Sequence, residues 1–156
     1  MPADRIEREI DIEAPIDVVW AVITEPEHIN GWFTDAVEVD IRPGGEGHFR
    51  WDANDKRGEH VVNLRVERLE PPHFFSFRWE YPDGAVPDET NAPLVEFSLE
   101  ARGESTRLRL VESGLESIAR SDEAKEKYFT EHTRGWMQIA EQLRDYAPKQ
   151  RSSVTG

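Results

Sequence analysis

Residues 121–146 read SDEAKEKYFTEHTRGWMQIAEQLRDY, and this stretch decides which fold the rest of the chain is expected to adopt. Its apolar side chains recur every three to four residues, which is the period of an amphipathic α-helix. The apolar stripe comprises Phe129, His132, Trp136, Ile139, Ala140 and Leu143, extended by Tyr128, Gly135 and Tyr146. A helix of about 26 residues is about 39 Å long. We therefore expect the other elements to supply a broad apolar surface beneath it.

The two ends of this helix carry the expected boundary signals. Ser121 is a suitable N-cap, and Asp122 and Glu123 suit the positive end of the helix dipole. Pro148 is expected to end the helix. Within the stripe, His132 and Gly135 are the two residues that apolar packing explains least well.

Length and composition predict one globular domain. A chain of 156 residues with 37% hydrophobic and 10% aromatic residues can bury a substantial core. We expect a single domain over residues 1–147 and a loose tail over residues 148–156, which follows the helix stop. No apolar run approaches the roughly 18 residues that a membrane-spanning helix needs, and the first 11 residues do not resemble a signal peptide. These features favour a cytoplasmic protein.

The charge and the absence of cysteine exclude several function classes. A net charge of −13 repels phosphate backbones and anionic lipids, so we expect neither nucleic acid nor membrane as a partner. The chain contains no cysteine, which removes disulfides, thiolate metal sites and thiol nucleophiles.

The N-terminal part of the chain predicts a strand followed by two short helices. Over residues 5–13, Ile6, Arg8, Ile10 and Ile12 alternate with acidic residues, as in a strand with one face buried. Pro15 is suited to the first turn of a helix that runs to Thr24. A further helical turn begins at Pro26 and is followed by the aromatic pair Trp32 and Phe33.

From residue 36 to residue 114 the apolar period is two, which indicates a series of strands. Six strands are expected, marked by alternating apolar residues over 37–41, 47–51, 60–66, 75–81, 95–99 and 108–110. Turn residues such as Pro43-Gly44-Gly45 and Gly103-Glu104-Ser105 separate some of them, and a long loop is expected over residues 82–93. Closely spaced hairpins imply antiparallel pairing. We therefore predict an α+β fold in which a seven-stranded antiparallel sheet wraps around the long C-terminal helix.

Several motifs, taken in order, resemble one known superfamily. They include Ile12-Glu13-Ala14-Pro15, Glu25-Pro26-Glu27-His28, Gly31-Trp32-Phe33, Arg42-Pro43-Gly44-Gly45, Glu112-Ser113-Gly114 and Gly135-Trp136. As a set this order is similar to the SRPBCC (START-like, helix-grip) superfamily, over roughly residues 5–147. Within that superfamily the chain resembles the group named after the C-terminal domain of the activator of the ninety-kilodalton heat-shock ATPase.

The resemblance implies a helix-grip fold, usually with a cavity between the long helix and the sheet. Members of the superfamily bind lipids, sterols, polyketides or plant hormones, and some cyclise polyketides. The chain departs from the chaperone activator because it lacks the separate N-terminal domain that stimulates the chaperone. The resemblance therefore implies ligand binding more strongly than chaperone activation.

His132 and Glu112 are the candidate acid–base residues. His132 lies on the predicted buried stripe, and Glu112 is in phase with Leu108 and Leu110 at the end of the last strand. Two interpretations are open. The two residues could form an acid–base pair inside an apolar cavity, where burial would shift both pKa values. Alternatively, His132 is a hydrogen-bonded core histidine and Glu112 lies at the rim of the domain.

The sequence predicts no metal site and no cofactor. His48 and His60 lie on neighbouring predicted strands, but a metal site would need a third ligand at suitable distances. The glycine-rich segment 44–47 precedes a strand rather than a helix, so it is expected to be a hairpin turn rather than a phosphate-binding loop.

The large aromatic side chains are the strongest indication of function. Many bulky rings packed around a helix tend to leave a gap, which favours an apolar pocket. The ligand-binding residues that we predict are Trp32, Phe33, Phe49, Trp51, His60, Phe77, Trp79, Phe97, Glu112, Phe129, His132 and Trp136. The first hypothesis is therefore a non-catalytic protein that binds a small hydrophobic or aromatic molecule.

Two other hypotheses remain. The second is a cyclase- or hydrolase-type enzyme that uses His132 and Glu112. The third is a stress-related, co-chaperone-like bacterial protein whose acidic outer surface contacts a heat-shock ATPase. Whether the protein is a monomer or a homodimer is left open by the sequence.

Overall fold

The structure, a computed structural model, describes residues 5–33, 36–51, 60–81, 92–114 and 121–150. At residues 51, 60, 61, 80 and 81 it describes the backbone alone. The helices are α1 (Ile16–Thr24), α2 (Pro26–Trp32), α3 (Asp122–Tyr146) and a 3₁₀ helix, η2 (Ala147–Gln150). The strands are β1 (Arg5–Ile12), β2 (Ala36–Val39), β3 (Glu46–Trp51), β4 (His60–Glu70), β5 (Phe74–Tyr81), β6 (Leu94–Arg102) and β7 (Ser105–Ser113).

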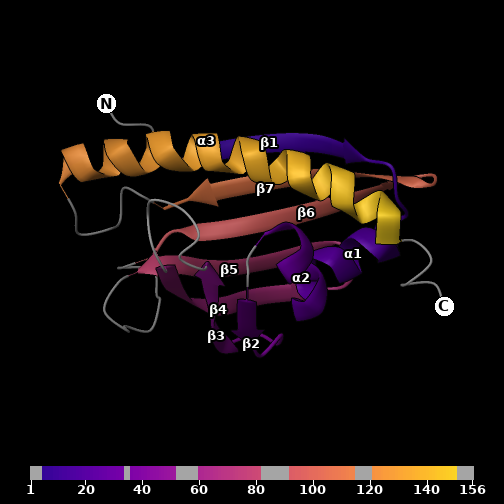
Figure 1. The fold of residues 1–156 in the computed structure, drawn as a ribbon, viewed down its shortest axis with the longest axis horizontal. Coiled ribbons are helices and arrows are strands. Elements are labelled where there is room, and N and C mark those ends of the chain that lie inside the picture. Colours follow the sequence, from indigo (N-terminus) through magenta and orange to yellow (C-terminus); the bar gives the residue numbers. More distant parts are fainter. Residues whose placement is uncertain (1–4, 34–35, 52–59, 82–91, 115–120, 151–156) are drawn as a thin grey trace.

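The seven strands form one antiparallel sheet in the order β1-β7-β6-β5-β4-β3-β2. Figure 1 shows α3 lying along β1 on one side of the sheet, with α1 and α2 beside the C-terminal half of α3. This arrangement confirms the predicted α+β fold, in which the strands wrap around the long C-terminal helix. The first strand, β1, pairs with the last strand, β7, and is therefore an edge strand of the sheet. Helix α3 lies along this edge strand.

Local sequence signals account for the boundaries of the elements. The Ser121 side chain accepts a hydrogen bond from the Ala124 amide, so it caps α3 as predicted. Pro15 is the N-cap of α1 rather than its first residue, and Pro26 is the first residue of α2. Gly44 and Gly103 have φ values of +81° and +66° in turns, a region of backbone space that favours glycine.

The inward-facing side chains of alternate strand positions form the core. Val62, Leu64 and Val66 of β4 are buried, as are Phe75, Phe77 and Trp79 of β5. These residues have the period of two that predicted the strands. Arg8 is the exception on β1, because it lies between Ile6 and Ile10 on the inward side. Among buried side-chain polar atoms of the described residues, only its Nε lacks a hydrogen-bond partner.

Two predicted boundaries differ from the structure. The helix that begins at Pro26 continues through Trp32, so Trp32 is its last residue rather than the residue after it. The second strand ends at Val39 and does not include Ile41. These are shifts of one or two residues at element ends, where local signals are weakest. The predicted turn over 54–58 and most of the predicted loop over 82–93 lie outside the described residues.

Candidate functional site

A fully buried carboxylate, Glu112, lies between α3 and the sheet. Its Oε2 accepts hydrogen bonds from Trp79 Nε1 at 2.8 Å and from the Tyr128 hydroxyl at 2.5 Å. Its Oε1 accepts hydrogen bonds from Trp136 Nε1 at 2.8 Å and from His132 Nδ1 at 3.0 Å. An ionised carboxylate offers about four lone-pair positions, so these four donors satisfy Glu112 completely. We call Glu112 with Trp79, Tyr128, His132 and Trp136 the carboxylate cluster.

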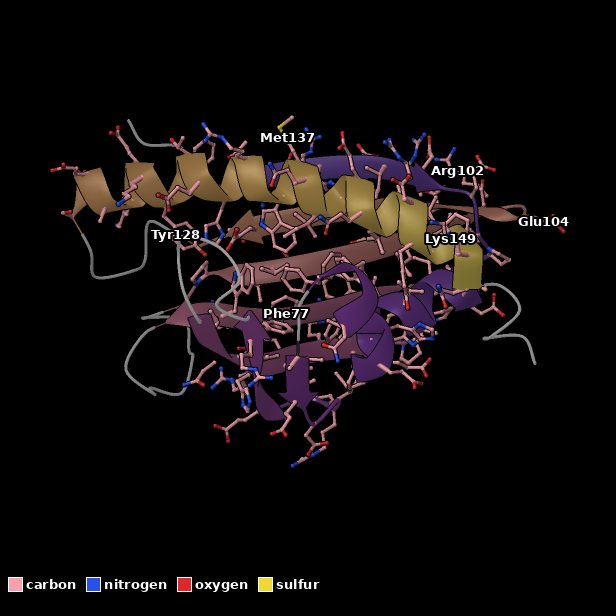
Figure 2. The ribbon with its side chains drawn as sticks, in the orientation of Figure 1. Phe77, Arg102, Glu104, Tyr128, Met137 and Lys149 are labelled. Carbon is pink, nitrogen blue, oxygen red and sulfur yellow. The ribbon has the colours of Figure 1, made fainter. Side chains whose placement is uncertain are left out.

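Three elements bring the carboxylate cluster together. Glu112 lies near the end of β7 and Trp79 near the end of β5, and both are buried. The other three members follow each other at intervals of four along α3, so they share one face of the helix. In Figure 2 the labelled Tyr128 side chain extends from α3 toward the sheet, whereas Met137 extends away from it. One face of α3 is therefore attached to the sheet through a single carboxylate.

The rings of the carboxylate cluster also contact one another. The Tyr128 and His132 rings are stacked with their centroids 3.7 Å apart, and the Trp79 ring meets the His132 ring edge-on at 5.6 Å. The Trp79 and Trp136 rings are 5.5 Å apart. Since the His132 side chain is 16% exposed and its Nδ1 is bonded to Glu112, the orientation of the imidazole ring is fixed by the carboxylate.

Two opposing effects act on the ionisation of Glu112. Burial raises the pKa of Glu112, because a charged carboxylate loses its hydration inside the protein. The hydrogen bond and charge of His132, with the hydrogen bonds of Tyr128 and Trp79, lower the pKa further than burial raises it. The net result is a pKa below the ordinary value, so Glu112 is ionised at neutral pH although no part of it is exposed.

An aromatic cluster fills the space next to Glu112. Phe33, which follows α2, contacts Trp32, Phe49, Trp79 and Trp136 at centroid distances between 5.1 and 5.7 Å. Phe77, labelled in the interior in Figure 2, contacts Phe49, Phe75 and Phe97. A cavity of about 10 Å³ remains, lined by Ile23, Ile29, Trp32, Phe33, Phe49, Phe75, Phe77 and Phe97. That volume holds about one water molecule, whereas ligand pockets are roughly 300 Å³ or larger.

Most predicted site residues lie in one continuous region. Trp32, Phe33, Phe49, Phe77, Trp79, Phe97 and Trp136 belong to the aromatic cluster, and Phe129 is half-buried against it. His132 and Glu112 are hydrogen-bonded to each other, as one of the two interpretations required. The side chains of Trp51 and His60 lie outside the described part of the chain.

One expectation about this region needs correction. Glu112 does not lie at the rim of the domain, because it is 0% exposed beneath α3. The reason is that Glu112 keeps the phase of Leu108 and Leu110 to the end of β7, and α3 extends past it. The described aromatic residues pack against one another and leave about 10 Å³ between them at this place, and the predicted ligand cavity stays a prediction.

Tyr128 is the member of the carboxylate cluster that sequence reasoning did not select. It was recognised only as part of the apolar stripe. The available signal was the spacing of Tyr128, His132 and Trp136, because three hydrogen-bond donors at intervals of four share one helix face. Such a row of donors facing a buried surface requires an acceptor opposite it, and Glu112 is the acceptor.

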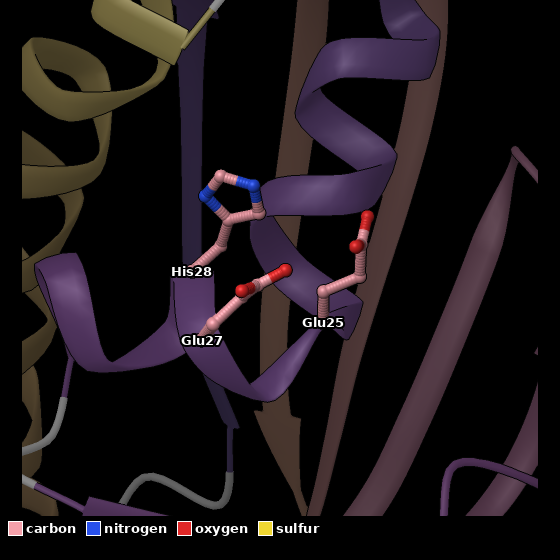
Figure 3. Close-up of side chains that lie close together, drawn as sticks. All are labelled: Glu25, Glu27 and His28. Atoms are coloured by element: carbon pink, nitrogen blue, oxygen red, sulfur yellow. The ribbon is translucent and has the colours of Figure 1, made fainter. Parts of the chain in front are cut away.

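A second group of titratable side chains lies at the start of α2. Candidate ligand atoms of Glu25, Glu27 and His28 lie within 4.8 Å of one another. Figure 3 shows the three side chains. His28 Nδ1 also shares a hydrogen bond of 3.0 Å with the Tyr146 hydroxyl, and burial and the charge of Glu27 raise the pKa of Tyr146. The two glutamates are exposed and lie where the helix dipole favours negative charge, which accounts for them without a metal ion.

Comparison with known families identifies the chain. The family model described as Activator of Hsp90 ATPase homolog 1-like protein, AHSA1, matches residues 13–147. The chain belongs to the AHSA1 family. This confirms the resemblance found in the sequence motifs. A search of curated proteins finds no match to this AHSA1 member.

Solved structures share the fold of this AHSA1 member. DynU16, from the dynemicin biosynthetic locus, is 20% identical with a TM-score of 0.72; the match covers 98% of this chain and 50% of DynU16. Protein NE0264 from Nitrosomonas europaea is 17% identical with a TM-score of 0.76, covering 96% of this chain and 97% of that one. The Aha1 dimer from Colwellia psychrerythraea is 17% identical with a TM-score of 0.71, covering 93% and 96%.

These similarities concern the fold of the AHSA1 member alone, because the sequence identities are only 17–20%. The chain spans about half the length of DynU16. None of the described helices combines the length and apolarity that crossing a bilayer requires.

Proposed function

We propose that the protein binds a small hydrophobic or aromatic molecule between α3 and the sheet. The observation that carries the proposal is an aromatic interior that adjoins one buried, fully hydrogen-bonded carboxylate. Specific ligand sites combine an apolar lining with a few placed polar groups, and the carboxylate cluster supplies those groups here. The AHSA1 family and the fold similarity to DynU16, a protein of the dynemicin biosynthetic locus, support this proposal.

The small cavity determines how a ligand would have to enter. A cavity of about 10 Å³ leaves no room for a ligand beside the rings as they are packed, so binding requires side chains or α3 to move. Burial of about 300 Å² of apolar ligand surface gives on the order of 7 kcal/mol before the costs of association. The expected dissociation constant is therefore about micromolar or weaker.

Fluorescence titration tests the proposal directly. Trp79 and Trp136 lie in contact with the region in which the ligand would bind, so binding of an aromatic compound is expected to change their emission. We expect saturable, one-to-one binding of N-phenyl-1-naphthylamine, with dye emission that rises as the dye leaves water. Phe33→Ala should strengthen binding, because Phe33 fills the space between Trp32 and Trp136.

The matched control for this titration is Met137→Ala, which truncates an exposed apolar side chain on the outer face of α3. It should leave dye binding unchanged. If the dye and a panel of lipids and polyketides show no saturable binding to the wild type or to Phe33→Ala, the ligand-binding proposal is wrong.

Acid–base catalysis is a second candidate, favoured by the hydrogen bond of 3.0 Å between Glu112 and His132. Because four donors occupy Glu112, the carboxylate would orient the imidazole, and Nε2 of His132 would transfer the proton. Any hydrolysis or cyclisation found with purified protein should then fall about 100-fold or more in His132→Gln. Equal turnover in wild type and His132→Gln would exclude this candidate.

A further inference from the structure

Helix α3 has two halves that are held to the domain in different ways. In the C-terminal half, Trp136, Ala140 and Leu143 are buried, and Trp136 and Leu143 belong to the main hydrophobic core. Elements from the other end of the chain also contact this half. Phe33 stacks on Trp136, and His28 shares a hydrogen bond with Tyr146. The C-terminal half is therefore fixed by apolar packing on several sides.

Among the described residues, the N-terminal half of α3, residues 122–134, has fewer apolar attachments. Tyr128 is its one buried side chain, and Phe129 is half-buried against the core. Tyr128 and His132 supply two of the four hydrogen bonds that Glu112 accepts. Figure 1 shows that α1 and α2 lie beside the other half of α3, away from residues 122–134. The attachment of this half to the sheet thus depends strongly on one carboxylate.

Gly135 separates the two halves, and packing does not require a glycine there. A Cβ atom built on Gly135 would meet no neighbouring atom within 4 Å. A glycine inside a helix increases the freedom of the backbone and weakens the helix locally. The weakest position of α3 therefore lies between the half held by the core and the half held by Glu112.

From these observations we infer that residues 122–134 form a lid that pivots at Gly135, and that a ligand admitted beneath the lid presents a hydrogen-bond donor to Glu112. The inference rests on the proposed ligand-binding function and states how that site opens and which ligands it takes. Opening the lid removes Tyr128 and His132 from Glu112 and takes His132 away from the Trp79 ring.

The chemistry of the uncovered carboxylate selects the ligand class. Glu112 keeps its bonds to Trp79 and Trp136 and presents the acceptor positions that Tyr128 and His132 have left. A buried carboxylate without its donors is strongly destabilised, so a ligand must replace them. An apolar molecule with a hydroxyl or ammonium group can do so, whereas a carboxylate ligand would add a like charge. The expected ligands are apolar molecules that carry a hydroxyl or amine.

Hydrogen exchange measures the lid without any ligand. Amides from residue 126 to residue 134 should exchange at least about tenfold faster than amides from 137 to 146, at similar rates within each segment and with a step at Gly135. Gradual fraying from the N-terminus would instead give rates that decrease steadily along the helix. Gly135→Ala should slow exchange of the lid about two- to fivefold, because alanine strengthens the helix at the pivot.

Gln138→Ala is the matched control, since it alters an exposed residue of α3 beyond the pivot and should leave lid exchange unchanged. Glu112→Gln replaces two acceptor positions by an amide donor group, so it should speed exchange of residues 126–134 more than that of 137–146. A single exchange rate along α3, unaffected by Gly135→Ala, would overturn the lid.

Binding of two matched probes tests the ligand class. 2-Naphthol and 2-methoxynaphthalene have similar apolar surfaces, but only 2-naphthol has a hydroxyl donor. 2-Naphthol is expected to bind at least about tenfold more tightly to the wild type, as a hydrogen bond to a charged acceptor implies. Equal affinities would overturn the assigned ligand class. If neither probe bound, and the dye and the panel of lipids and polyketides did not bind either, while exchange still showed the step at Gly135, the proposed function would fail and the lid would stand.

Discussion

Glu112 is the residue on which the attachment of the N-terminal half of α3 to the sheet most depends. A carboxylate with no exposed surface is strongly destabilised unless donors compensate for the lost hydration. Here the compensation is complete, with two donors on each oxygen, and three of the four come from α3. The same residue thus specifies the rotation of α3 about its axis, because only one face of the helix carries the three donors.

The stability of the protein should depend on pH through Glu112. The pKa of Glu112 is lowered in the folded protein, so between this pKa and its value of about 4.3 in the unfolded chain, only the unfolded chain binds the proton. The stabilisation from Glu112 is therefore present above about pH 4.3 and is lost as pH falls through the folded pKa. The slope of unfolding free energy against pH should decrease in Glu112→Gln by up to about 1.4 kcal/mol per pH unit.

Urea unfolding between about pH 3 and pH 6 would measure that slope. Glu104→Gln is the control, because Glu104 is exposed in the turn between β6 and β7 (Figure 2). Parallel pH profiles for the wild type and Glu112→Gln would contradict the prediction.

The two buried tryptophans Trp136 and Trp32 allow a comparison of how much a hydrogen bond to a charged acceptor and one to a neutral acceptor stabilise the protein. Trp136 Nε1 donates to the Glu112 carboxylate at 2.8 Å, and Trp32 Nε1 donates to the neutral Val22 carbonyl at 2.9 Å. Both side chains are at most 4% exposed. Hydrogen bonds to charged groups contribute roughly twice as much as neutral ones, so Trp136→Phe should destabilise the protein by about 1 kcal/mol more than Trp32→Phe.

Urea denaturation at neutral pH compares the two variants. Because both substitutions remove an indole nitrogen from a buried aromatic site, the loss of ring area is matched. A larger cost for Trp32→Phe would show that the charge of Glu112 does not strengthen its bond to Trp136.

At the scale of elements, α3 combines a strong start with a weak middle. Ser121 caps the helix, and Asp122 and Glu123 complement its dipole. Gly135 follows thirteen helical residues and weakens the helix at that point. The strands are different, since Gly47 of β3 lies so close to β2 that a Cβ atom would be 2.1 Å from the Glu38 carbonyl oxygen. Steric contacts thus require a glycine at position 47 of β3 but do not require one at position 135 of α3.

This difference predicts opposite effects of two alanine substitutions. Gly135→Ala should stabilise the protein by about 0.5–1 kcal/mol, because the added methyl group meets open space and alanine favours the helix. Gly47→Ala should destabilise it by more than about 1 kcal/mol, because β2 must move away from β3. Thermal unfolding measures both. Destabilisation by Gly135→Ala would show that α3 requires a glycine at this position.

At the scale of the whole molecule, apolar and charged residues are separated by the sheet. The side that faces α1, α2 and α3 carries the aromatic cluster, and the outer side carries ion pairs such as Arg107 with Asp11 and Arg109 with Glu7. These pairs are exposed, so each contributes little to stability. The acidic excess remains, and the chain has a net charge of −13.

Salt should therefore stabilise the protein. Raising NaCl from about 10 mM to about 150 mM shortens the Debye length from about 30 Å to about 8 Å and screens the repulsion among the acidic residues. The expected result is a rise of the melting temperature, measured by circular dichroism, with KCl at equal ionic strength as the control for ion-specific effects. A fall of the melting temperature would show that the surface ion pairs outweigh the net repulsion.

The sequence by itself determined the elements, their antiparallel pairing and the resemblance to the family, because periods of two and 3.6 residues, local capping signals and motifs are properties of the chain. It also placed His132 on the buried face of its helix and put Glu112 in phase with Leu108 and Leu110, but left open whether Glu112 lies inside the domain or at its rim. Only the tertiary structure decided that these two residues meet, that Tyr128, Trp79 and Trp136 bind the same carboxylate, and that the aromatic rings leave about 10 Å³ of space. The reason is that hydrogen-bond distances and cavity volumes depend on how α3 is positioned on the sheet, and that position results from contacts between residues far apart in the chain.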